Sequence, residues 1–110
     1  MSDPKDQQPP APKIHQEFIA RYPELGKAWE LMAEAGRDGP LDDRTVRLIK
    51  LAVAMGAMRE GAVHASVRKA RAQGISAAEI EQAVAVAAST MGLPSAVALY
   101  SWCRDVLNKE

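Results

Sequence analysis

The chain has 110 residues, with 14 basic and 14 acidic side chains and a formal net charge of zero. This length suggests a single domain, and the balanced charge gives no sign of a nucleic-acid partner. Its single cysteine, Cys103, cannot form an internal disulfide, no apolar run reaches the roughly 18 residues of a membrane span, and the N-terminus lacks a secretory h-region, which together indicate a cytoplasmic protein.

Residues 1–13 are rich in proline, with Asp, Lys and Gln between the prolines. A segment of this composition buries too little apolar surface to offset the entropy of ordering it. We therefore predict a mobile tail over residues 1–13 and one helical domain over residues 14–110.

Two helices are predicted first. The first short helix places three apolar residues on one face, namely Ile14, Phe18 and Ile19. Pro23 ends it, because proline disfavours helical geometry in the residue before it, and the same proline suits the first turn of the second helix. The second helix has an apolar stripe at helical spacing, formed by Leu25, Ala28, Trp29 and Met32, and "AGRDGP" ends it.

A third helix is predicted to begin near Asp42, a favourable N-cap residue. Its predicted inward face holds Val46, Ile49, Val53 and Gly56, with Leu48, Ala52 and Met55 beside them. Gly56 and Gly61 predict a break before the fourth helix. That helix turns Val63, Val67 and Ala70 toward the core and ends at Gly74, a residue typical of a helix C-terminus.

Ser76 and Glu79 match the capping box that begins a fifth helix, "AAEIEQAVAVAASTMG". That helix is apolar on nearly every side, which is typical of a buried helix. Leu93-Pro94 begins a sixth, and no segment has strand-like alternation, so the predicted fold is all-α. Five side chains in helical segments are predicted to be core residues, namely Trp29, Met55, Met58, Met91 and Trp102. With so few bulky side chains, we expect the core to be completed across a subunit interface.

Two stretches carry a family resemblance. "LDDRTVRLIKLAVAMGA" followed by "REGAVHASVRKARAQGISAAEIEQAVAVAASTMGLPSAVALYSW" resembles the carboxymuconolactone decarboxylase family, which includes the alkylhydroperoxidase D-like (AhpD-like) proteins, over residues 40–105. The resemblance implies an AhpD-like bundle of about six helices. It also implies a homo-oligomer, commonly a trimer or hexamer, whose subunits associate through helical interfaces.

The peroxidase branch of this family carries Cys-x-x-Cys-x-x-x-His with a glutamate twelve residues before the first cysteine. When the chain is aligned on Arg68 and Gly74, the cysteines fall on Arg59 and Ala62, and the histidine falls on Ser66. Aligning on His64 instead also supplies no cysteine. Another branch reads E-G-A-V-H-S-H, of which this chain keeps the first histidine, His64, and has Ser66 in place of the second.

Glu60 and His64 are the catalytic candidates. They are four residues apart and share a helix face if one helix carries both. A carboxylate can hold an imidazole in one tautomer and raise its basicity, which suits a general base. The alternative interpretation is a solvated pair or a hydrogen bond at an interface.

The substrate-binding candidates are Arg59, Arg68 and Ser66. Guanidinium groups, including that of Arg71, can bind a carboxylate through two parallel hydrogen bonds, although charges on a helix are more often its solvated face. Cys103 is interpreted as a small buried hydrophobe. His15 has no nearby set of metal ligands, so we predict neither a metal nor another cofactor.

These patterns lead to three functional hypotheses. The first is cofactor-free acid-base chemistry of the decarboxylase or lactone type on a small carboxylated compound, with His64 and Glu60 at its centre. The second is a peroxiredoxin-like alkylhydroperoxidase, which the missing Cys-x-x-Cys disfavours. The third is a non-catalytic oligomeric binding or scaffold protein. None involves a nucleic acid or a membrane.

Overall fold

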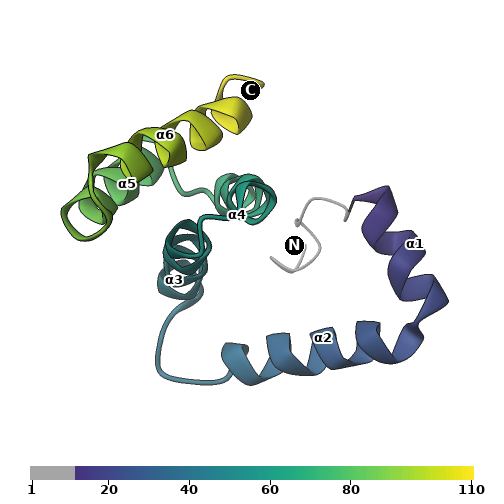
Figure 1. Ribbon diagram of the computed structural model, residues 1–110. Coiled ribbons are helices and arrows are strands. Elements are labelled where there is room, and N and C mark those ends of the chain that lie inside the picture. Colours follow the sequence, from purple (N-terminus) through teal and green to yellow (C-terminus); the bar gives the residue numbers. More distant parts are fainter. Residues whose placement is uncertain (1–11) are drawn as a thin grey trace.

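The computed structural model describes residues 12–110, so most of the predicted tail lies outside the described residues. This part of the chain forms α1 (Lys13–Arg21), α2 (Pro23–Arg37), α3 (Asp43–Gly56), α4 (Glu60–Ala72), α5 (Ala77–Met91) and α6 (Leu93–Leu107), with no strand (Figure 1). The predicted all-α fold of six helices is confirmed.

The predicted helix ends are also confirmed, because local chemistry determines them. Asp42 caps α3 by accepting a hydrogen bond of 2.7 Å from a backbone N–H of the first turn. Ser76 and Glu79 form both hydrogen bonds of the capping box before α5. Gly74 has a φ of 86°, a conformation that a residue with a Cβ rarely adopts, and it turns the chain after α4.

The core lies between α3, α4, α5 and α6. It consists of thirteen buried residues, namely Leu51, Ala54, Met55, Val63, Val67, Ala70, Ile75, Ile80, Val84, Ala96, Leu99, Cys103 and Leu107. The inward face predicted for α4 is therefore correct. The one predicted for α3 is wrong, because Ile49 and Val53 are 46% and 66% exposed. Apolar residues lie on both sides of α3, and only the position of α4 decides which side is covered.

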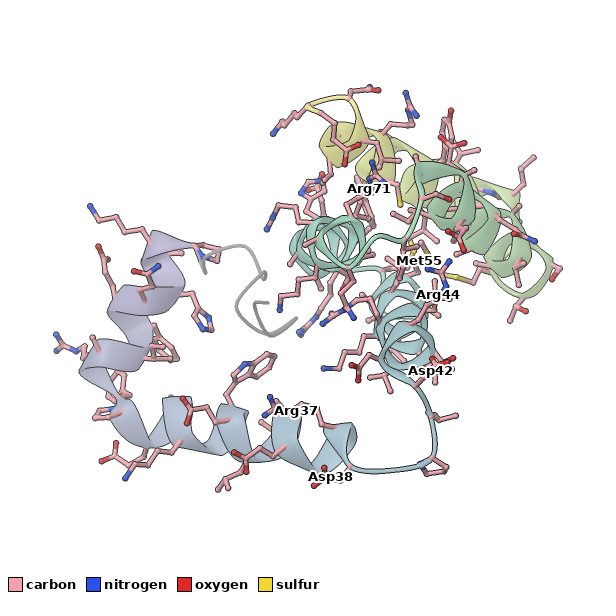
Figure 2. All side chains as sticks on the ribbon, turned by 180° about the vertical axis from the view of Figure 1, so that it is seen from behind. Arg37, Asp38, Asp42, Arg44, Met55 and Arg71 are labelled. Carbon is pink, nitrogen blue, oxygen red and sulfur yellow. The ribbon has the colours of Figure 1, made fainter. Side chains whose placement is uncertain are left out.

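The helices α1 and α2 form an N-terminal arm, residues 13–37, that extends away from the other four helices (Figure 1). A short segment between Asp38 and Asp42 connects the arm to α3 (Figure 2). Neither helix of the arm has a buried residue. Trp29 is 56% exposed and Met58 is 36% exposed, so the prediction that they are core residues is wrong for the single chain.

The fifth helix is only partly covered within one chain. It buries Ile80 and Val84, whereas Val86 on another side is 64% exposed. Its apolar outer surface and that of the arm are thus both open to solvent. Within residues 12–110, no helix has both the length and the apolar character that crossing a bilayer requires.

Candidate functional site

The candidate site lies between α4 and α6. His64 follows Glu60 by one turn of α4, and Glu60 is the first residue of that helix, so both side chains share a face as the sequence suggested. Across from them, Asp105 of α6 places its Oδ2 atom 3.1 Å from His64 Nε2. The His64 side chain is 26% exposed and that of Asp105 is 50% exposed. The imidazole is therefore partly withdrawn from water and remains reachable.

The buried valines of α4 explain this position of His64. Val63 and Val67 are fully buried one turn apart, and His64 is rotated by about 100° from Val63 around the helix axis. This places the imidazole at the edge of the apolar stripe, where α6 packs beside α4. Cys103 and Leu107 belong to the same core cluster and hold α6 there, with Asp105 between them in sequence.

Glu60 completes a cluster of two carboxylates and one imidazole, which we call the acid-base cluster. One ligand atom from each of Glu60, His64 and Asp105 lies within 4.8 Å of the other two. Such a group can orient the imidazole and move a proton to or from a bound compound. Of the described residues, this is also the set that could hold a divalent cation, because imidazole nitrogen and carboxylate oxygens are ligands that Zn²⁺ accepts.

Asp105 is the residue that sequence reasoning missed. It lies 41 residues after His64, and the two meet only because α6 packs against α4. Helical periodicity relates only residues three or four apart in the sequence. It therefore predicts that Glu60 lies beside His64, but it cannot predict a partner on another helix.

The structure separates the three candidates for substrate binding. Arg68 follows His64 by one turn of α4 and is exposed on the same side, whereas Arg59 is the exposed N-cap residue of that helix. Ser66 is two residues from His64, which places it about 200° away around the axis. It is half-buried on the other flank of α4, and its role in substrate binding stays a prediction.

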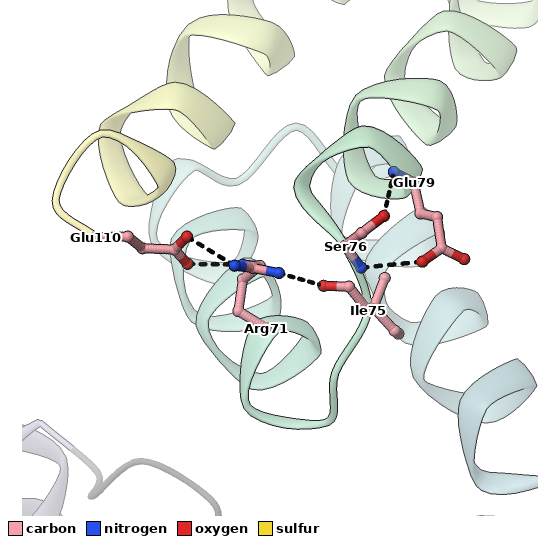
Figure 3. A network of polar contacts seen from close by, with 5 residues as sticks. All are labelled: Arg71, Ile75, Ser76, Glu79 and Glu110. Atoms are coloured by element: carbon pink, nitrogen blue, oxygen red, sulfur yellow. Dashed lines mark hydrogen bonds and ion pairs between the residues drawn. The ribbon is translucent and has the colours of Figure 1, made fainter.

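Arg71 has a structural role instead of the substrate-binding role considered for it. Its Nε and one terminal nitrogen donate to the two carboxylate oxygens of Glu110 over 2.7 and 2.9 Å, and the other terminal nitrogen donates to the Ile75 carbonyl over 3.0 Å (Figure 3). The hydrogen bond to Glu110 raises the pKa of Arg71, and the same bond lowers the pKa of Glu110. Arg71 thus joins the end of α4 to the C-terminus of the chain.

Cys103 is fully buried, as the sequence predicted, and burial raises the pKa of its thiol to about 11. We expect iodoacetamide to alkylate the folded protein at about pH 8 at least about a hundredfold more slowly than the chain unfolded in guanidinium chloride, because the thiolate is the nucleophile. Mass spectrometry of the adduct over time measures both rates. Fast alkylation of the folded protein would show an accessible, ionised thiol.

The same shift predicts a loss of stability in alkali. The folded-state pKa of Cys103 lies above the ordinary thiol pKa of about 9, so above pH 9 the unfolded chain releases a proton that the folded chain retains. The contribution of this thiol to stability is therefore complete below about pH 9 and decreases as the pH rises toward about 11. Cys103→Ala, compared with the original chain by denaturant unfolding over this range, should lack this part of the pH dependence.

A comparison with known protein families identifies the family of the chain. The sequence model described as "Carboxymuconolactone decarboxylase family" matches residues 23–105, which include α2 to α5 and nearly all of α6. Neither the search of curated proteins nor that of solved structures found a match. The match covers more than half of the chain and includes all three residues of the acid-base cluster.

Proposed function

The chain belongs to the carboxymuconolactone decarboxylase family, and from this premise we propose that it carries out cofactor-free acid-base chemistry on a small carboxylated or lactone-like compound, with His64 as the proton-transfer group. The observation that carries the proposal is the 3.1 Å contact between His64 Nε2 and Asp105 Oδ2, with Glu60 beside it. Asp105 is thereby added to Glu60 and His64 as a candidate catalytic residue.

In this proposal, His64, Asp105 and Arg68 have different roles. With the proton on His64 Nε2 held by Asp105, the other ring nitrogen is left as the base, and the carboxylate stabilises the imidazolium once it forms. In a decarboxylation, His64 first takes the proton of the substrate's carboxyl group. The bond between that carboxylate and carbon then breaks, CO₂ leaves, and the electron pair remains on the conjugated lactone. The imidazolium then returns the same proton to carbon. Arg68, exposed on the same side of α4, is the group placed to hold a substrate carboxylate.

Carbon dioxide release from carboxymuconolactone tests this proposal. We expect turnover by the purified chain that is unchanged after removal of metal ions with EDTA, since the proposed chemistry uses only side-chain protons. A rate that EDTA abolishes and Zn²⁺ restores would assign the acid-base cluster to a metal and would contradict the cofactor-free mechanism. No turnover of this or related lactone acids would favour the non-catalytic binding or scaffold protein.

The peroxidase hypothesis has little support. A dithiol cycle needs two thiols, and the chain contains one, which is buried and has a raised pKa. We expect no hydroperoxide consumption with a dithiol reductant. A robust activity that Cys103→Ser abolishes would contradict this expectation.

We also propose that the chain associates with copies of itself through the N-terminal arm. The arm has no buried residue, yet Phe18, Leu25 and Trp29 are each about half exposed along it. Helices of 9 and 15 residues are marginal in water unless an apolar face is covered. On the other four helices, Val53, Val86 and Val97 are exposed apolar side chains that a second copy can cover. A trimer or hexamer is the assembly that the family resemblance implies.

A further inference from the structure

Five basic side chains from three helices form what we call the basic cluster: Arg37 of α2, Arg47 and Lys50 of α3, and Arg68 and Lys69 of α4. Among residues 12–110, none of them has a carboxylate within ion-pair distance. The arginines that do form ion pairs are Arg44, Arg71 and Arg104, whose partners are Glu79, Glu110 and Glu81. Glu79, Glu81 and Glu110 thus pair with arginines outside the basic cluster.

The positive charges of the basic cluster repel one another. Burial lowers the pKa of Lys69, and the charges of Arg47, Lys50 and Arg68 lower it further. Burial likewise lowers the pKa of Lys50, with additional contributions from Arg47 and Arg37. Like charges held together at a partly desolvated position destabilise the folded chain unless a counter-ion is bound there.

Arg47 is fixed at the seam between α3 and α4. Its Nε donates a hydrogen bond of 2.6 Å to Oε1 of Gln73, a residue that follows α4 directly. This bond leaves both terminal amino groups of the guanidinium without a partner among residues 12–110, and these are groups that bind an oxyanion through two parallel hydrogen bonds. Arg47 and Lys69 are half-buried, so the seam is partly shielded from water.

Lys50 and Arg37 bring further positive charge to this seam. Lys50 follows Arg47 by three residues and therefore lies on the same face of α3. At the end of α2, Arg37 points toward α3 and α4, whereas Asp38 points to the opposite side (Figure 2). Lys69 is five residues from His64, about 140° around α4, and so lies on a different flank of that helix, whereas Arg68, about 40° from His64, lies between the two clusters.

We propose that the basic cluster binds a small multivalent oxyanion, a phosphate ester or a polycarboxylate, at the seam of α3 and α4. Arg47 supplies two parallel hydrogen bonds, and Lys50 and Lys69 supply further charge. A small anion fits better than a nucleic acid, because the chain as a whole is neutral and the cations meet at one point instead of following a long stripe. This site stands whether or not His64 is catalytic.

The test is isothermal titration calorimetry, in which the heat of binding is measured as sodium pyrophosphate is added to the full chain at constant ionic strength. Sodium chloride serves as the reference. We expect saturable binding and a higher midpoint of thermal unfolding at saturation, since a ligand that binds only the folded state stabilises it. Lys69→Gln and Arg47→Gln should each weaken binding about tenfold or more, the usual effect of losing a charge-assisted hydrogen bond. Arg47→Lys, which keeps the charge and loses the paired hydrogen bonds, should fall between the original chain and Arg47→Gln.

Lys109→Gln is the matched control. It removes the same charge from an exposed position outside the cluster and should change the affinity by no more than about twofold, because salt screens distant surface charges. No saturable binding, or equal losses in Lys109→Gln and Lys69→Gln, would overturn the proposal. A DNA duplex that binds more tightly than pyrophosphate and displaces it would also overturn it. Citrate in place of pyrophosphate distinguishes the two sources of the anion, because the tighter of the two identifies a carboxylate or a phosphate ligand.

Discussion

His64→Gln is expected to lower the rate of carboxymuconolactone decarboxylation by about 10²- to 10⁴-fold, the usual contribution of a positioned general acid or base. Glutamine keeps a polar side chain of similar reach but cannot exchange a proton near neutral pH. Asp105→Asn should cause a smaller loss, because a carboxamide still contacts the imidazole at the 3.1 Å position while no longer stabilising the imidazolium. Steady-state release of CO₂ measures all three rates.

The fold should survive His64→Gln. The contact with Asp105 is partly exposed, and ion pairs of this kind contribute about 0 to 1 kcal/mol to the free energy of unfolding. The matched control is His15→Gln, which removes the other histidine of the chain, on α1. Loss of activity together with unfolding would assign His64 a structural role, and full activity in His64→Gln would place the chemistry elsewhere.

Trp29→Asp is expected to weaken self-association by about 30- to 1,000-fold, corresponding to the roughly 2 to 4 kcal/mol that an aromatic anchor contributes to an interface. The side chain is 56% exposed in the single chain, on a helix without a buried residue. Sedimentation velocity of the original chain and the variant over a range of concentrations measures the change.

Leu31→Asp provides the control for the arm. Leu31 is 65% exposed on the same helix, and it lies about 200° from Trp29, off the apolar stripe. We expect this variant to assemble like the original chain. Equal dissociation in both variants would mean that any charge added to α2 disrupts the assembly. A monomeric original chain at micromolar concentration would contradict assembly through the arm.

Most of the fold follows from local sequence features. Asp42, the capping box of Ser76 and Glu79, and Gly74 each set a helix end through bonds or dihedral angles within a few residues. The stripe of Val63, Val67 and Ala70 was predictable because the polar face of α4 is clearly charged. On α3 and α5, apolar residues lie on several sides. The same reasoning therefore predicted the wrong buried face for α3, and for α5 it predicted more burial than one chain provides.

The sequence by itself determined the six helices, their ends, the family and the pairing of Glu60 with His64, because all of these depend on residues close together in the chain or on their order along it. Only the tertiary structure decided that Asp105 meets His64 and that basic residues of three helices gather without carboxylates. The physical reason is that these relations depend on how whole helices pack against one another, and packing is set by the combined burial of many side chains.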